Sequence, residues 1–291
     1  MKIKTAAKIN LALDVTGRLD NGYHLIESVF QTVGIYDEVT VELSGEGISL
    51  SCELPEMFAK SDPIPCDERN IAYKAALKFA EETGIAAGCT IHIKKGIPSQ
   101  AGMGGGSTDA AAVLWCLNEL NGKPLDRDRL AALGKTLGAD VPFFFTGGTA
   151  YVGGIGEKIT PLPVFSGRTL LIAKGKEGVS TGEAYARIDA LEAPLHPDTT
   201  GLVNALKTSP ETSHEFFGNL FEQAVSLREV ADIKAAMLAS GALNAVMTGS
   251  GSAVFGLFSS EKEAGRCANA LRGKGYFAQV CETAANSFTV I

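Results

Sequence analysis

Hydrophobic and polar residues alternate along the N-terminal third of the chain. In KINLALDV the apolar side chains fall at every second position from Ile9 onward, which is the period of a strand with one buried face. Lys8 and Asn10 then share the other face. An Asp-Asn-Gly turn signal at 20–22 follows, and HLIESVFQTVGIYDEVTVEL predicts two more strands. The pattern of this third therefore indicates an antiparallel sheet.

Helical spacing replaces the alternation further along the chain. ERNIAYKAALKFAEETG carries apolar residues such as Leu77 and Phe79 at helical spacing, and Gly84 is a suitable C-cap. GCTIHIKKGIPSQ returns to the strand period and leads into a glycine cluster. STDAAAVLWCLNELNG then predicts a second helix, which Ser107 or Thr108 would cap. A strand, a glycine loop and a helix therefore follow one another directly.

The rest of the chain mixes helices and strands. DRDRLAALGKTLGA predicts a short helix, and DVPFFFTGGTAYVGGIGEKITPLP predicts sheet and glycine turns up to a proline-rich boundary at 159–165. Strand patterns in LLIAKG, NAVMTGSGSAVFGLF and YFAQVCETAANSFTVI alternate with helical ones in GEAYARIDAL, NLFEQAVSLREVADIKAAMLASG and 261–273. We therefore predict an α+β protein of two domains, residues 1–163 and 164–291.

Composition and charge narrow the classes of function. The chain has 291 residues, of which 45% are hydrophobic and 20% charged, enough for a large core. The formal net charge of -7 argues against a nucleic-acid partner, because nothing would supply a broad phosphate-neutralising face. We see no membrane-spanning segment and no secretion signal, so we expect a soluble, cytoplasmic protein. Six scattered cysteines predict neither a zinc site nor a disulfide framework.

The glycine cluster PSQAGMGGGSTDAA, residues 98–111, places four glycines in the five positions 102–106. A helix start leaves backbone N–H groups unpaired, and glycine lets an anion approach them closely. The alternative is a tightly packed structural turn. Neither a Walker A loop, which needs a lysine, nor a dinucleotide fingerprint, which needs glycine where Ser107 stands, fits. Asp109 would repel a bound phosphate unless it points away to cap the helix or helps to hold a metal.

This loop resembles the phosphate-binding motif of the GHMP kinases, a family that includes galactokinase, homoserine kinase and mevalonate kinase. Met103 stands where the family has leucine, a change that conserves side-chain volume. AAKINLALDVTGRLDNGYHLIESVFQ, LGADVPFFFTGGTAYVGGIGE and VMTGSGSAVFGLF resemble further motifs of one branch of the family. The resemblance spans nearly the whole chain. It implies a GHMP kinase fold, in which an N-terminal domain like that of a ribosomal protein and a ferredoxin-like C-terminal domain enclose a cleft.

That branch implies an activity and two central residues. It implies transfer of a phosphoryl group from ATP, with Mg²⁺, to the 2-hydroxyl of a cytidine-diphosphate-linked methylerythritol, in the non-mevalonate route to isoprenoids. The resemblance makes Asp140 the acceptor of the hydroxyl proton and Lys8 the cation that keeps this carboxylate ionised. Taken alone, Lys8 fits a solvated strand lysine equally well, and Asp140 fits a turn residue.

The resemblance also assigns binding residues. For ATP they are Pro98, Gly102, Met103, Gly104, Gly105, Gly106, Ser107, Thr108, Asn70 and Lys94. For the substrate they are Asn10, Tyr23, His24, Thr181, Tyr185, Gly249 and Gly251. The Tyr23 ring would stack on the cytosine base and His24 would hydrogen-bond to its edge. Ser107 is the expected Mg²⁺ ligand, with Thr108 as second choice.

Purely structural roles remain alternatives for most of these residues. Tyr23 and His24 also fit the first pair of a hairpin strand, Tyr185 fits a core tyrosine, and Lys94 fits a solvated edge. At the level of the whole protein, another GHMP kinase, acting on mevalonate, homoserine or a sugar, would keep the same phosphate loop. A non-catalytic nucleotide-binding protein on the same scaffold is a further alternative. The sequence does not decide between a monomer and a homodimer.

Overall fold

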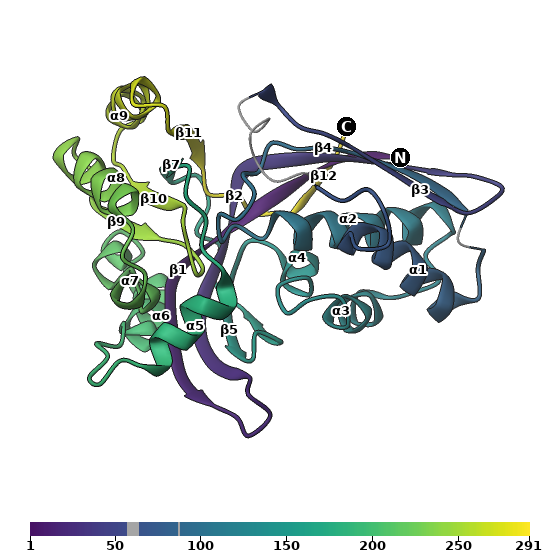
Figure 1. The fold of residues 1–291 in the computed structure, drawn as a ribbon, viewed down its shortest axis with the longest axis horizontal. Helices are drawn as coiled ribbons and strands as arrows, with labels where there is room; N and C mark the ends of the chain where they lie inside the picture. Colours follow the sequence, from purple (N-terminus) through teal and green to yellow (C-terminus); the bar gives the residue numbers. More distant parts are fainter. Residues whose placement is uncertain (57–63, 87) are drawn as a thin grey trace.

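The computed structural model describes residues 1–56, 64–86 and 88–291 (Figure 1). Its strands are β1 (Lys2–Arg18), β2 (His24–Leu43), β3 (Ile48–Glu53), β4 (Cys89–Lys94), β5 (Thr149–Gly154), β6 (Lys158–Pro161), β7 (Thr169–Lys174), β8 (Gly218–Asn219), β9 (Asn244–Met247), β10 (Val254–Leu257), β11 (Phe277–Glu282) and β12 (Phe288–Val290). Its helices are α1 (Ile71–Thr83), α2 (Gly105–Leu120), α3 (Arg127–Lys135), α4 (Phe143–Thr146), α5 (Thr181–Asp189), α6 (Thr199–Thr208), the 3₁₀ helix η2 (Ser213–Phe216), α7 (Phe221–Ala224), α8 (Arg228–Ala239) and α9 (Glu261–Gly273).

The described strands form two sheets. The first has the order β12-β1-β2-β4-β3, with β5 and β6 joined through β2 and β8 paired to β1. The second, β11-β7-β10-β9, is antiparallel throughout. Helices α1 to α4 lie along the first sheet, and α8 and α9 lie on the second (Figure 1). The predicted α+β class is thus confirmed. The division at residue 163 stays a prediction, since β8 and β12 of the later part both pair with β1.

The hairpin of β1 and β2 is the longest feature of the molecule and runs through both halves (Figure 1). The pattern in 24–43 predicted two strands, but the structure has one, β2. A register shift makes Gly34 and Ile35 extra residues in β2, and such a bulge bends a strand without ending it. A Cβ at Gly34 would lie 3.3 Å from the backbone oxygen of Glu282 in β11. The bend therefore brings the two sheets close together.

Strand β1 is buried on both faces, although its alternation predicted one buried face. Leu11 lies in a core with Val33 of β2 and Phe255 of β10, which joins the two sheets. The opposite face carries Lys8 and Asn10, and these are only 3% and 1% exposed. The alternation therefore marks a buried polar face rather than a solvated one.

Helix α1 ends where the sequence predicted. The Asn70 side chain accepts a hydrogen bond from the N–H of Ala72, and Gly84 takes the left-handed conformation at the C-terminus. The buried stripe includes Ala72 and Phe79. Leu77, however, is 37% exposed and lies outside this stripe, so its predicted place in the apolar face is wrong.

The predicted cap of α2 and the predicted strand at FFFT are both wrong. The N-cap is Gly104, with φ +70°, and no side chain caps the helix. Ser107 and Thr108 lie inside the first turn, where the Thr108 hydroxyl hydrogen-bonds to that of Thr5 instead. Residues 143–146 form the helical turn α4, because Pro142 has the φ of a helix start.

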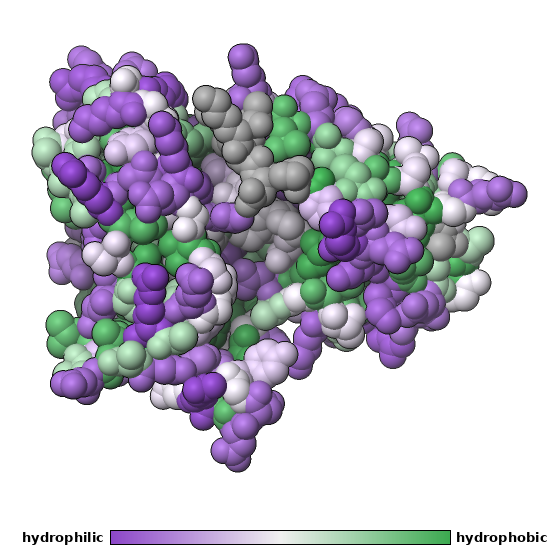
Figure 2. Space-filling model, in the orientation of Figure 1, coloured by the Kyte–Doolittle hydropathy of each residue, from purple (hydrophilic) through white to green (hydrophobic). Residues whose placement is uncertain are grey.

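The C-terminal half departs from its predicted pattern in two places. Helix α6 has no counterpart among the predicted elements, and NLFEQAVSLREVADIKAAMLASG forms two helices, α7 and α8, with a break at Val225. All six cysteines are free thiols. Within the described part of the chain, we find no helix with the length and apolar character needed to span a membrane. On the face drawn in Figure 2, hydrophilic and hydrophobic residues are interspersed.

We expect Leu11→Ala to lower the free energy of unfolding by about 2–5 kcal/mol, because it leaves a cavity in the core that joins the two sheets. Denaturant unfolding of the purified variant measures this change. Leu77→Ala is the matched control, since Leu77 is partly exposed, and its effect should stay below about 1 kcal/mol. Equal losses in the two variants would contradict the assignment of Leu11 to this core.

Candidate active site

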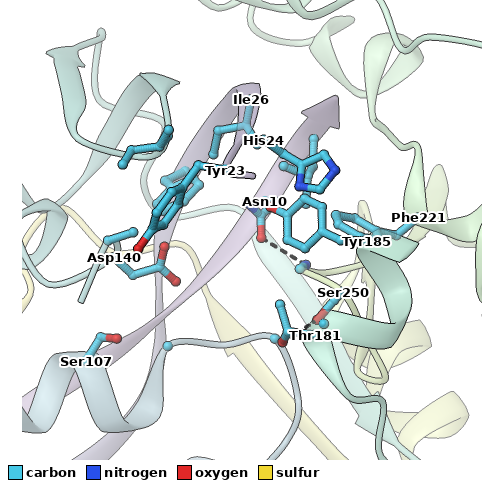
Figure 3. Close-up of a pocket in the computed structure, with 18 of the residues that line it drawn as sticks. Asn10, Tyr23, His24, Ile26, Ser107, Asp140, Thr181, Tyr185, Phe221 and Ser250 are labelled. Atoms are coloured by element: carbon cyan, nitrogen blue, oxygen red, sulfur yellow. Dashed lines mark hydrogen bonds between the residues drawn. The ribbon is translucent and has the colours of Figure 1, made fainter. Parts of the chain in front are cut away.

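A cavity of about 710 Å³ lies between the two halves of the chain. Its walls come from β1, the hairpin tip, the glycine loop, the start of α2, the turn before α4, helix α5 and the loop after β9 (Figure 3). Of the predicted site residues, those that line it are Lys8, Asn10, Tyr23, His24, Gly102, Gly104, Ser107, Asp140, Thr181, Tyr185 and Gly249. The structure thus brings together residues from positions 8 to 249.

Lys8 and Asp140 meet in the wall of this cavity. The Nζ of Lys8 lies 3.5 Å from Oδ2 of Asp140, and the two side chains are 4% and 32% exposed. The Phe30 ring centroid lies 4.6 Å from the same Nζ, which adds a cation–π contact. Asp140 occupies a turn whose neighbours Val141 and Phe143 are fully buried. The turn is therefore anchored while the carboxylate stays open to the cavity.

Asn10 holds Lys8 in place and joins the two halves. Its Oδ1 accepts hydrogen bonds from Nζ of Lys8 (2.9 Å), from Oγ1 of Thr248 (3.1 Å) and from the N–H of Gly249 (2.9 Å). Its Nδ2 donates to Oγ of Ser28 at 3.0 Å. With so many protein partners, Asn10 organises the site. Its predicted contact with substrate stays a prediction.

Two glycine loops touch backbone to backbone beside Lys8. A Cβ at Gly102, where φ is +71°, would clash with the carbonyl oxygen of Thr248. A Cβ at Gly249, with φ +58°, would lie 2.7 Å from the Cα of Gly102. Gly104 approaches the Phe144 ring and the Lys8 side chain in the same way. Close packing therefore requires glycine at these positions, whether or not a ligand binds.

The first turn of α2 carries backbone amides for which no hydrogen-bond partner is found among the described residues. Its first intrahelical hydrogen bond runs from the N–H of Thr108 to the oxygen of Gly104, at 2.8 Å. The N–H groups of Gly105, Gly106 and Ser107 precede this ladder and lie at the positive end of the helix. Ser107 lines the cavity, whereas the fully buried Thr108 does not.

Aromatic rings gather at the far end of the cavity. His24 stacks on Tyr185 with ring centroids 4.4 Å apart, and Tyr185 meets Phe221 edge-on at 4.9 Å. Burial, and then the charge of Asp140, raise the pKa of Tyr185 to about 12, so its phenol keeps its proton at neutral pH. Tyr23 is 60% exposed and lies across the cavity from Tyr185 (Figure 3).

Four residues at this end carry no recognisable signal in the sequence: Arg18, Asp189, Ser250 and Phe221. Nε2 of His24 lies 2.7 Å from Oδ1 of Asp189, and Nη1 of Arg18 donates to Oδ2 of Asp189 at 3.0 Å. Oγ of Ser250 lies 3.1 Å from Oγ1 of Thr181. The other residue is Phe221 of α7. Arg18 comes shortly after the residues that alternate as a strand, and Asp189 is the last residue of α5, so only the folded chain brings the two together.

Eight predicted ATP or substrate residues are not part of the cavity wall. They are Pro98, Met103, Gly105, Gly106, Thr108, Asn70, Lys94 and Gly251. Both amide atoms of Asn70 are bonded to protein, through the N–H of Ala72 and the oxygen of Pro65. Lys94 is exposed and pairs with Glu53 at 3.6 Å. Binding roles for these residues stay predictions.

Asp109 points away from the cavity, one of the two outcomes the sequence allowed. It is buried and its Oδ2 accepts a hydrogen bond from Nζ of Lys95 at 2.6 Å. It does not cap the helix, however. Lys95, the neighbour of the exposed Lys94, is therefore a buried cation.

Comparison with known proteins gives consistent matches. The model of the GHMP kinases N terminal domain matches residues 70–148, and that of the GHMP kinases C terminal domain matches residues 204–276. The 4-diphosphocytidyl-2-C-methyl-D-erythritol kinase of Clostridium botulinum (strain Alaska E43 / Type E3) is 42% identical over 277 residues, 94% of this chain and 96% of the relative. That of Clostridium tetani (strain Massachusetts / E88) is 41% identical over 278 residues, with the same coverage.

Solved structures give the same result. A crystal structure of 4-(cytidine 5'-diphospho)-2C-methyl-D-erythritol kinase superposes with a TM-score of 0.81 at 31% identity, covering 98% of this chain and 99% of the other. A homoserine kinase from Cytophaga hutchinsonii superposes with a TM-score of 0.77 at 21% identity, covering 100% and 97%, and shows the shared fold alone.

Fold and matches together define a GHMP kinase, an enzyme built from the two domains of that superfamily. Within it, the chain belongs to the 4-diphosphocytidyl-2-C-methyl-D-erythritol kinase family.

We expect Gly102→Ala to separate the two glycine loops, because the new Cβ would meet the Thr248 carbonyl in a left-handed backbone conformation. The free energy of unfolding should fall by about 1–3 kcal/mol, and kcat/KM should fall with it. Thermal unfolding and steady-state kinetics measure the two effects. Gly265→Ala in α9 is the control, since a Cβ there meets no atom within 4 Å. A Gly102→Ala protein as stable and active as this control would refute the contact.

Proposed function

We propose that this protein transfers the γ-phosphoryl group of ATP to the 2-hydroxyl of 4-diphosphocytidyl-2-C-methyl-D-erythritol. The observation that carries the proposal is the pairing of Lys8 with Asp140, at 3.5 Å, beside the free amides of α2. The relatives that are 41 to 42% identical over 94% of the chain support this choice of substrate.

In the proposed reaction the Asp140 carboxylate accepts the proton of the substrate hydroxyl. The hydroxyl oxygen then attacks the γ-phosphorus, the bond to the β-phosphate oxygen breaks, and ADP leaves with the electron pair. Lys8 pairs with this carboxylate and donates to the attacking oxygen, and its Asn10 and Phe30 contacts fix the ammonium. Most of the acceleration then comes from alignment and fixed charge rather than from covalent chemistry.

The free amides of Gly105, Gly106 and Ser107 are the proposed donors to the phosphate chain. Among the described residues, no group of three or more His, Cys, Asp or Glu side chains is placed to hold a metal ion. The cavity does offer the Ser107 hydroxyl. Mg²⁺ commonly binds through one or two protein oxygens together with substrate phosphates, so Ser107 fits an ion that arrives with ATP. Bound there, Mg²⁺ would neutralise phosphate charge.

The aromatic end of the cavity is the proposed cytidine site. Tyr23 and Tyr185 face each other across it (Figure 3), and aromatic rings stack on flat bases. The contact of Nε2 of His24 with Asp189 leaves Nδ1 as the nitrogen available to the base edge. A mevalonate or homoserine kinase has no use for such a set of rings, which disfavours those alternatives. ATP and a nucleotide-linked substrate are cytoplasmic metabolites, so we expect the protein there.

Asp140→Asn should lower kcat by roughly 10²–10⁴-fold, because the amide cannot accept the hydroxyl proton. The dissociation constant for ATP should change little, since Asp140 lies at the hydroxyl end of the site. Steady-state kinetics and calorimetry measure the two quantities separately. Asp128→Asn on the exposed side of α3 is the control. Retention of near-normal turnover in Asp140→Asn would exclude its role as the base.

Tyr23→Ala should raise the KM for the cytidyl substrate by about tenfold, the scale of one base-stacking contact, with the KM for ATP unchanged. A substrate panel with and without the cytidine diphosphate group, assayed by ADP release, completes this test. Tyr73→Ala in α1 is the matched control, because Tyr73 lies outside the cavity. An unchanged KM would mean that Tyr23 is only a hairpin residue, and turnover of mevalonate or homoserine instead would overturn the choice of substrate.

A further inference from the structure

Three buried charged groups lie directly behind the glycine loop. Nζ of Lys95, at the end of β4, contacts Oδ2 of Asp37 on β2 and Oδ2 of Asp109 on α2, the latter at 2.6 Å. The three residues are 6%, 0% and 4% exposed. A Cβ at Gly105 would lie 3.5 Å from Nζ of Lys95. The ammonium therefore lies close to Gly105, the first residue of α2.

The two carboxylates are held very differently. Oδ1 of Asp37 accepts hydrogen bonds from the N–H groups of Gly96 (2.6 Å) and Ile97 (2.8 Å). Oδ1 of Asp109 is buried and, among the described residues, has no hydrogen-bond partner. Asp109 thus depends on Lys95 alone, whereas Asp37 anchors Lys95 to the segment that leads into the glycine loop.

The carboxylates around Lys95 stabilise its charged form. Burial alone would lower the pKa of its ammonium, but the carboxylates of Asp109 and Asp37 outweigh burial and raise it. A buried cation this close to Gly105 favours an anion at the helix start, and its hold on Asp109 restrains the first turn of α2. Stability gives little reason to keep such a cluster, since buried ion pairs are often replaced by apolar residues without loss.

We propose that Lys95 is a positioning residue for the nucleotide: from behind the glycine loop it fixes the start of α2 and offsets the charge of Asp109, so that the backbone amides of α2 can donate hydrogen bonds to phosphate. This inference rests on the proposed ATP site. Lys95 does not line the cavity, so it acts through the loop and not by touching the substrate hydroxyl. The ammonium of Lys95 also explains how the Asp109 carboxylate is tolerated near the start of a phosphate-binding helix.

Calorimetry with ATP·Mg²⁺ and, separately, with the cytidyl substrate tests the proposal without relying on turnover. Lys95→Met should weaken ATP binding by about tenfold or more, the scale of one buried charge acting over several ångströms, with cytidyl binding within about threefold of wild type. Asp109→Asn should not weaken ATP binding, because its amide oxygen still accepts from Lys95 and carries no charge. Lys95→Arg should retain most of the affinity. Lys2→Met, an exposed lysine paired with Glu38 on the same sheet, is the control.

Each outcome separates this inference from the proposed function. Wild-type protein that binds neither ligand would defeat the proposed function itself. Wild-type binding with normal ATP affinity in Lys95→Met would overturn only the role of Lys95. Equal losses for both ligands, or a loss in Asp109→Asn as large as in Lys95→Met, would show that the cluster is merely structural. If Lys95→Met does not fold, Lys95→Gln, which keeps a donor but no charge, gives the same comparison.

Discussion

The buried ammonium of Lys8 is the constraint around which the site is organised. A charge on a strand with both faces covered is tolerated only when it is paired and hydrogen-bonded. Lys8 meets this condition through Asn10, Asp140 and the Phe30 ring. Because Asn10 also binds Thr248 and Gly249 of the C-terminal half, satisfying one charge also ties the two halves together at the point where the chemistry is proposed to occur.

The glycine loops follow from the same constraint. The N–H of Lys8 donates to the oxygen of Met103 at 3.0 Å, which attaches the loop before α2 to β1. Asn10 attaches the loop after β9 to the same strand. The two loops are bound at Lys8 and Asn10, two positions apart on one strand, so they lie against each other, and only glycine lets backbones approach as closely as Gly102 and Gly249 do. Their glycines are thus required by packing, and the free amides of α2 are held in place as a result.

The sequence predicted the class of fold, most long elements and the central pair, but not the reasons for their positions. Alternation placed Lys8 and Asn10 on one face correctly, yet it could not show that a second sheet buries the opposite face. The closeness of Lys8 and Asp140 came from the family resemblance, because no spacing rule connects positions so far apart. The buried position of Lys95 could not be predicted, because two adjacent lysines are typical of a solvated strand edge. Successive side chains of an extended segment point to opposite faces, so Lys94 lies outside and Lys95 lies in the core. Gly104 as N-cap was missed because Ser107 and Thr108 are stronger capping residues in general.

The two ends of the cavity differ in how firmly they are held. At the Lys8 end the ammonium is buried, with a side chain only 4% exposed, and losing its partners would leave an unpaired charge in the interior. At the aromatic end, the hairpin tip and α5 are joined by Arg18, His24 and Asp189, with side chains 58%, 10% and 32% exposed. The ion pair of Arg18 with Asp189, at this exposure, contributes little stability, so this end can adjust to a ligand at small cost. Such a division suits the proposed function: phosphoryl transfer requires fixed geometry at Lys8 and Asp140, whereas the proposed recognition of the acceptor tolerates small adjustments of the hairpin tip and α5.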